Sequence, residues 1–198
     1  MKKILALAVI VSCLMCAACK KDGLSAYKEM ESKELAKGIR NDDLFFGVHF
    51  GMSMEDFYSH CYELNRQKIL REGAGNMTAQ YRMDTTEMKY VTYMDFYPKF
   101  YLNKIYYMPV TFQYMNWNPY DKKYSPENLQ VDVLKYMEKK YGQGFIKVVD
   151  PSKGRVFVKV DGNRRISITM DIERDVLVKI VDLTVAKQLG EKVWKDEW

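Results

Sequence analysis

The amino-acid sequence predicts an α+β domain built from a tandem repeat. In each half one helix is followed by several antiparallel strands, and both helices pack on one face of a single sheet. The prediction rests on two helix-capping signals, at Ser53 and Ser125, each followed by runs of alternating apolar and polar residues. One sheet is the economical arrangement because each helix needs an apolar surface and each strand offers one.

Residues 1–18 are expected to lie outside this domain, as a signal peptide. A pair of lysines precedes an apolar run from Ile4 to about Ala18, which is the arrangement of a secretion signal. A membrane-spanning helix needs about 20 apolar residues, and Lys20 ends the run before that length is reached.

Cys19 is the expected site of lipid attachment. Ala17-Ala18-Cys19 resembles the lipobox of bacterial lipoproteins, in which the chain is cut before a cysteine that is then acylated. Cys16 stands where that pattern usually has leucine. Cys13 fits the local pattern better, but cleavage there leaves two apolar residues at the start of the mature chain. Cys13 is therefore the alternative, beside an ordinary cleaved signal that carries no lipid.

The charge and the cysteine content argue against several classes of function. The net charge is +5, and the basic residues occur as scattered doublets with acids between them, whereas nucleic-acid binding needs a concentrated basic face. Beyond the acylated cysteine, Cys61 stands alone in the mature chain, so no intrachain disulfide is expected. The two histidines form no cluster with metal-ligand spacing. We therefore expect neither a metal nor a cofactor.

Residues 19–43 are expected to form a tether or a marginal helix. Ser25 to Lys37 has a helix-forming composition but only a weak apolar stripe, and Gly38 is a stop signal. The simplest interpretation is a spacer that lifts the domain off the membrane.

Residues 44–124 are the expected first half. A glycine-bracketed apolar stretch ends at Ser53, which caps a helix from Met54 to about Arg66. Phe57, Cys61 and Leu64 form the buried stripe of this helix. Strand-like runs then cover Ala79–Met83, Met88–Tyr97 and Lys104–Met115.

The last of these runs has two faces. Residues from Tyr106 to Tyr114 at even positions are expected to face the core, and the residues between them face water. Pro109 cannot donate to a ladder, so this strand is expected either at an edge of the sheet or with a bulge at that position.

Residues 125–198 are the expected second half. Ser125 caps a helix with Pro126 at its first position, Gly142 ends it, and its buried stripe includes Met137. The expected strands are Phe145–Val149, Arg155–Val160, Arg165–Ile172 and Val176–Leu183, with a tight turn at Asp161-Gly162-Asn163. The strict alternation in the third strand predicts that one of its faces is wet, and Val185 to Leu189 is expected to be a last helical turn.

Two resemblances accompany these patterns. The tandem arrangement resembles the fold of β-lactamase-inhibitor-protein-like domains, and Gly51-Met52-Ser53-x-Glu55 is similar to the helix start common there. The signal, together with residues 38–42, 44–64 and 161–166, resembles uncharacterised lipoproteins of Bacteroidota. Lys20-Lys21-Asp22 is similar to the surface-export signal of that phylum. The second resemblance implies a location in the cell envelope and no known reaction.

A tyrosine-rich sheet face is the candidate binding surface. Tyrosine offers a flat apolar ring and a hydroxyl, which suits the recognition of a glycan or a peptide. Alternation along the strands places several of these residues on the wet face, and two aromatic residues follow just beyond it. The candidate site residues are Tyr93, Tyr97, Tyr107, Gln113, Trp117 and Tyr120. The alternative is that these rings are packed beneath other parts of the chain or beneath a partner.

No catalytic residue is assigned, and the chain is not expected to be an enzyme. Asp95 and Glu87 are the one pair of carboxylates that invites acid–base chemistry, and no nucleophile motif or phosphate loop accompanies them. The expected function is that of a lipid-anchored binding or protein-interaction module of the bacterial cell envelope, in the outer membrane, on its periplasmic or its surface side. The alternative is a glycan- or peptide-binding accessory lipoprotein that uses the tyrosine-rich face.

Overall fold

The computed structural model describes residues 23–190 except 74, 76, 172 and 173. The expected signal peptide, Cys13 and Cys19 lie outside the described residues, as does the tail from residue 191. In chain order the elements are α1 (Gly23–Ala36), α2 (Met54–Arg66), β1 (Leu70–Glu72), β2 (Ala79–Met83), β3 (Thr92–Phe96), β4 (Lys99–Tyr101), β5 (Lys104–Tyr114), the 3₁₀ turn η2 (Lys122–Tyr124), α3 (Pro126–Tyr141), β6 (Ile146–Asp150), β7 (Gly154–Asp161), β8 (Arg164–Met170), β9 (Val176–Asp182) and α4 (Leu183–Gln188).

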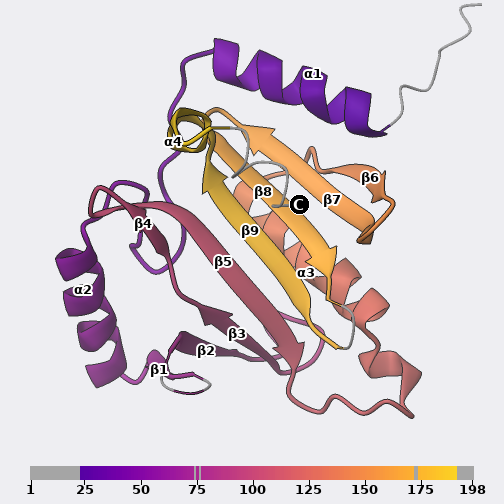
Figure 1. Ribbon diagram of the computed structural model, residues 1–198. Helices are drawn as coiled ribbons and strands as arrows, with labels where there is room; N and C mark the ends of the chain where they lie inside the picture. The colour runs from indigo at the N-terminus through magenta and orange to yellow at the C-terminus, as the bar shows by residue number, and fades with distance from the viewer. Residues whose placement is uncertain (1–22, 74, 76, 172–173, 191–198) are drawn as a thin grey trace, which may run out of the picture.

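The described strands form one antiparallel sheet of nine strands, on which four helices pack (Figure 1). The strand order is β1-β2-β3-β5-β9-β8-β7-β6, and β4 pairs with the N-terminal end of β5. Each half is therefore a helix followed by strands that run in chain order from an edge of the sheet to its centre. The two halves meet where their last strands, β5 and β9, pair. The predicted α+β class and tandem repeat are confirmed.

The helices α2 and α3 lie on the same face of the sheet. Phe57 and Leu64 of α2 join Leu129, Val133 and Met137 of α3 in one apolar core. Both predicted caps form: the Ser53 hydroxyl accepts from the Asp56 N–H at 3.1 Å, and the Ser125 hydroxyl accepts from the Asn128 N–H at 3.4 Å. The predicted placement of these two helices is therefore correct, and both begin and end at the expected residues.

The opposite face carries α1, over β6 and β7, and α4, over β9 and the start of β5 (Figure 1). Tyr27 of α1 is buried with Val156, Val158 and Val160, which point away from α3. The hydroxyl of Tyr27 also accepts a hydrogen bond from Arg165 at 3.4 Å. The helix expected within residues 19–43 is thus present, but it packs on the sheet. The interpretation as a spacer is wrong, because the ring of Tyr27 packs on the valines of β7 although the apolar stripe of the helix is weak.

The expectation that one face of β8 is wet is wrong. Arg165, Ser167 and Thr169 are all buried, as are the apolar residues between them. β8 lies between β7 and β9, and α1 covers Arg165. Alternation of polar residues indicated two faces correctly, but it did not indicate that a helix from the other end of the chain covers the polar one.

Pro109 lies on a central strand, so the edge alternative is wrong. Its neighbours are β3, whose pairing with β5 ends at Val110, and β4, whose pairing begins at Tyr107. Hydrogen bonds alternate along an antiparallel pair, so the missing N–H of Pro109 falls in the gap between β3 and β4. The bulge alternative is wrong at this position too, because the register shift of β4 lies opposite Tyr106 and the pairing with β9 is regular through Pro109. The expected strand at Met88–Tyr97 is shorter, because residues 84–88 form a turn. The three-residue strands β1 and β4 were not expected, since neither is long enough to show alternation.

Candidate functional site

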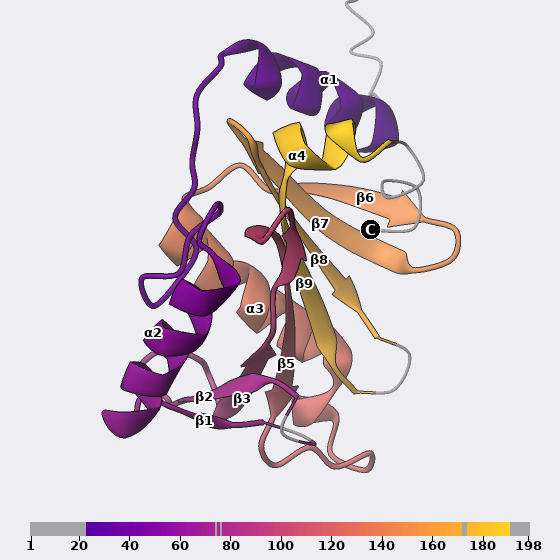
Figure 2. The same ribbon diagram turned by 60° about the vertical axis from the view of Figure 1, so that its left-hand side comes forward.

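An aromatic groove lies between α2 and the edge of the sheet at β1 and β2. Its volume is about 350 Å³. Figure 2 shows α2 standing beside the β1–β2–β3 end of the sheet, away from α1 and α4. The groove is lined by Phe57, Tyr58, Cys61, Tyr62, Asn65, Leu70, Arg71, Glu72, Met77, Thr78, Ala79 and Tyr97. We call this set the α2–β1 groove.

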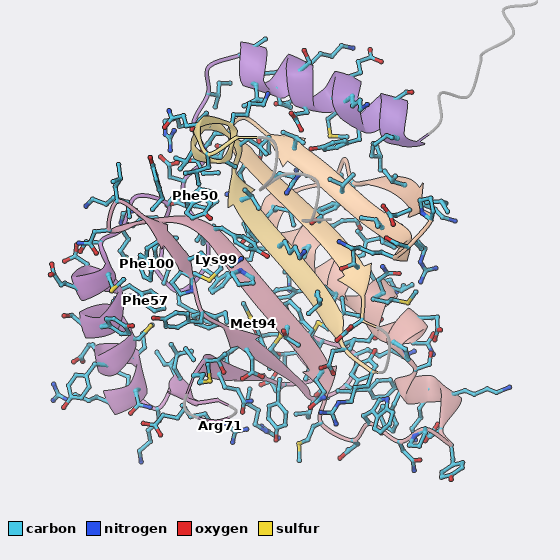
Figure 3. All side chains as sticks on the ribbon, viewed as in Figure 1. Phe50, Phe57, Arg71, Met94, Lys99 and Phe100 are labelled. Carbon is cyan, nitrogen blue, oxygen red and sulfur yellow. The ribbon has the colours of Figure 1, made fainter. Side chains whose placement is uncertain are left out.

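The helix α2 supplies the floor and one wall of the groove from two neighbouring stripes. Phe57 and Leu64 belong to its buried stripe, and Phe57 meets Phe100 of β4 edge to face, as the side chains in Figure 3 show. One residue further along, Tyr58 and Tyr62 are four positions apart and therefore stand above one another on the helix surface. Tyr62 is 69% exposed, although it is a large aromatic residue. The helix thus presents rings to solvent beside the rings that it buries.

Tyr97 closes the end of the groove. It follows β3, and its ring contacts that of Phe57 at 6.1 Å in an edge-to-face arrangement. The hydroxyls of Tyr58 and Tyr97 hydrogen-bond each other. This bond, together with partial burial, raises the pKa of Tyr97 to about 12. The Tyr97 hydroxyl therefore remains protonated at neutral pH, and a phenol hydroxyl is able to donate to a ligand or to accept from it.

Polar groups occur at the sheet side of the groove. The side-chain amide of Asn65 donates to the backbone oxygen of Leu70 at 3.2 Å and so ties α2 to β1. Glu72 is exposed, and no ion pair holds it within the described part of the chain. Cys61 is half-buried in the groove, and burial raises the pKa of its thiol to about 11. The thiol is therefore protonated at neutral pH, and Cys61 acts here as an apolar lining residue.

The tyrosine face expected from the sequence is not assembled. Tyr107 is 3% exposed, because it packs with Val181 and with Ala186 of α4, and the ammonium of Lys99 lies 4.8 Å from its ring centre. Tyr97 has left the strand and belongs to the α2–β1 groove on the other side of the sheet. The expectation that Tyr107 faces water is wrong. Alternation placed it on the correct face of β5 but did not reveal the helix that covers it.

Tyr93 and Gln113 do lie together on the face opposite α2 and α3. They are register partners on β3 and β5, and both are half-buried. The Arg71 guanidinium stacks 4.8 Å from the centre of the Tyr93 ring, and the side-chain amide of Gln113 donates to Asp175 at 2.8 Å. This part of the sheet face is polar, and its members are engaged with one another.

Trp117 and Tyr120 lie in the connector between β5 and η2. Trp117 is half-buried with the Arg174 guanidinium 5.8 Å from its ring centre. Tyr120 is 94% exposed. Neither residue lines the α2–β1 groove, so the six candidate residues are distributed over at least three places.

Glu87 and Asp95, the carboxylates considered for acid–base chemistry, lie on different faces of the sheet. Glu87 accepts from Tyr81, which packs against the core on the α2 side, whereas Asp95 accepts from Gln80 on the opposite face of the sheet. The two carboxylates therefore do not form a pair. No group of three His, Cys, Asp or Glu side chains in the described ranges is arranged to hold a metal ion, and no helix there is long and apolar enough to cross a bilayer.

A second hollow, of about 530 Å³, lies where residues 40–44 meet the end of α3. Its charges largely neutralise each other. Arg40 binds Asp42 and Asp182 at 2.7 Å, and Arg164 binds Asp161 at 2.9 Å. The Arg40–Asp182 pair joins the segment before α2 to β9, while a hydrogen bond from Asn41 to Asp161 joins it to β7 and one from Arg164 to the Asp43 oxygen joins it to β8. The hollow is therefore better explained as the joint that fixes this segment than as a ligand site.

Comparisons with protein-family models, with curated proteins and with solved structures find no match. The assignment of a site therefore rests on geometry. The sequence pattern predicts Phe57 and Cys61 as core residues only, and it predicts no role for Tyr58, Tyr62 or Met77. The signal that was available is the second stripe of α2, in which rings recur four residues apart next to the buried stripe.

Proposed function

We propose that this chain is a lipid-anchored protein of the bacterial cell envelope, an outer-membrane lipoprotein that acts as a binding module without enzymatic activity. The α2–β1 groove is its binding surface. The observation that carries this proposal is the set of aromatic and apolar side chains that the groove leaves in contact with water, above all Tyr62 and Met77, which are 69% and 76% exposed. Concave surfaces lined mainly by apolar and aromatic side chains, with a few polar groups among them, are the usual form of a binding site.

The alternative use of a tyrosine-rich sheet face by a glycan or a peptide has lost its basis. Tyr107 is buried and Tyr97 has joined the groove. Aromatic recognition of a partner remains part of the proposal, but it moves to the opposite side of the sheet. On that side the rings of α2 line the concave α2–β1 groove. The tyrosine-rich face, in contrast, is polar around Tyr93 and Gln113, and these side chains contact other residues of the chain.

The position of the groove supports its role in an anchored protein. The described chain begins at Gly23, which packs so closely on β6 that an added Cβ would lie 2.7 Å from the Lys147 oxygen. β6 and β1 are the two ends of the strand order. Seven steps of about 4.8 Å separate them along the sheet, roughly 34 Å. A lipid on Cys19 would hold the β6 edge next to the bilayer. The elements α2 and β1 lie at the far edge of the sheet (Figure 1), so the groove between them would be free for a partner.

Acylation is tested by labelling cells with radioactive palmitate. We expect the label to enter the unsubstituted chain and to be absent from Cys19→Ala, which should accumulate as a slowly processed precursor. Cys13→Ala is the matched control and should be labelled normally. Label in Cys19→Ala would contradict the assignment and make Cys13 the lipidated residue.

Binding is tested by photo-crosslinking in intact cells. A benzoylphenylalanine residue replaces Met77 at the rim of the groove or, as the control, Tyr120, which is still more exposed but lies outside it. We expect discrete crosslinked products from position 77 that position 120 does not give. Identical products from both positions, or none from position 77, would contradict the proposal.

A further inference from the structure

The edge strand β1 borders the α2–β1 groove. β1 is the first strand in the sheet order, and in the described residues it pairs with β2 alone. Leu70 and Glu72 of β1 line the groove together with the rings of α2. An apolar groove and an unpaired strand edge therefore lie side by side, and a single ligand is able to contact both.

The hydrogen bonds of the β1–β2 pair determine which backbone groups face outwards. The Gly73 N–H donates to the Thr78 oxygen at 2.8 Å, and Arg71 lies opposite Gln80 in the same register. Bonded and non-bonded pairs alternate along an antiparallel ladder. Gly73 and Arg71 therefore direct their backbone groups towards β2, while Leu70 and Glu72 direct theirs to the outside of the sheet.

The outward backbone groups of Leu70 and Glu72 differ in their hydrogen bonding. The Leu70 oxygen accepts the hydrogen bond from Asn65, which leaves Glu72 with both its N–H and its C=O at the open edge. The side chain of Glu72 points to the groove side, as that of Leu70 does, because residues two apart in a strand share a face. Glu72 thus offers a donor and an acceptor for a partner backbone, and a carboxylate for a cationic side chain.

Charged side chains on an edge strand normally prevent indiscriminate pairing. Arg71 and Glu72 make β1 such an edge. Pairing with it becomes favourable for a segment that also fills the groove, because burial of one apolar side chain against Tyr62 and Leu70 adds to the backbone hydrogen bonds. Strand addition to a sheet edge, with alternate side chains in pockets, is an established mode of peptide recognition.

We propose that the occupant of the α2–β1 groove is an extended peptide segment of a partner protein, which pairs with β1 through Glu72 and places an apolar or aromatic side chain in the groove next to a basic residue. This inference rests on the proposed function, since it names the partner for the same surface. The inference goes beyond the proposed function because it assigns recognition to the backbone of β1 as well as to the rings of α2.

The test uses linear dodecapeptides displayed on phage and selected on the full chain in detergent micelles. Enriched peptides are synthesised, and their dissociation constants are measured for three proteins: the unsubstituted chain, Glu72→Ala and Glu72→Pro. Glu72→Ala keeps the outward N–H and should weaken binding by no more than about fivefold, the worth of one exposed ion pair. Glu72→Pro removes that N–H and should weaken binding by about tenfold or more, the loss of a hydrogen bond together with steric exclusion.

A second measurement protects the result against a folding defect in Glu72→Pro. Each peptide amide is methylated in turn, and binding to the unsubstituted chain should fall at alternate positions only, as strand pairing requires. Failure to enrich any peptide, equal binding by Glu72→Pro and Glu72→Ala, or uniform tolerance of methylation would each overturn strand addition. If Tyr62→Ala then still abolished crosslinking from position 77, the groove would remain the binding surface and only the strand pairing would be lost.

Discussion

The two halves of the chain have the same order of helix and strands, but they differ in how completely their helix and sheet surfaces are buried. In the second half α3 buries Leu129, Val133 and Met137 completely, and even its polar Gln130 is buried, where it donates to the backbone of β7 and β8. In the first half α2 buries Phe57 and Leu64 but leaves a row of tyrosines in water.

The other face of the sheet repeats this contrast. The second half carries Val156, Val158 and Val160 there, beneath α1. The corresponding face of the first half is polar around Tyr93 and Gln113, which are half-buried, and the packing of α4 on this half is at the start of β5, at Tyr106 and Tyr107. One half is thus closed on both faces and the other is open at its helix and at its edge strand. We infer that the second half supplies most of the stability, while the first half presents the surface that binds.

The largest expected effect is the loss of a core side chain in the closed half. Met137 of α3 is fully buried, so Met137→Ala should lower the free energy of unfolding by about 2–5 kcal/mol, through lost burial and the cavity that remains. Urea denaturation measures this directly. Lys139→Ala, two positions further along the exposed side of the same helix, is the control, and an equal effect of both substitutions would show that the buried face of α3 is misassigned.

How far the sequence predicted this molecule depends on the range of the interaction. The caps at Ser53 and Ser125 act within one helical turn, so both helices could be located to the residue. Alternation acts within one strand, and it assigned the faces of β5 correctly from Tyr107 to Tyr114. It failed at the start of the strand, where Ile105 lies in the core and Tyr106 packs with α4, because the pairing with β4 shifts register there. Pairing of β1 and β4 involves three residues each, too few for a period to emerge.

The candidate site depended on contacts that are distant in sequence, and there the predictions failed. Tyr107 is buried by α4, and Arg165 by α1, each through packing that local patterns do not encode. The alternation predicts Tyr97 as part of a strand, but β3 ends one residue earlier. The apolar stripe of α2 predicts which residues the helix buries and does not predict the exposed rings beside it. A further aromatic stripe beside it is the feature that indicates an exposed surface.

The smallest expected effect on stability, and the most direct test of the division between the halves, is Tyr62→Ala in the open half. Tyr62 is mostly exposed and alanine favours the helix, so the free energy of unfolding should change by no more than about 0.5 kcal/mol. Crosslinking from position 77, measured in the same variant, should nevertheless fall by about tenfold or more, as expected when an aromatic anchor is lost. A stable variant that crosslinks as well as the unsubstituted chain would contradict the assignment of binding to the α2–β1 groove. A loss of stability by more than about 2 kcal/mol would show instead that α2 is as closed as α3.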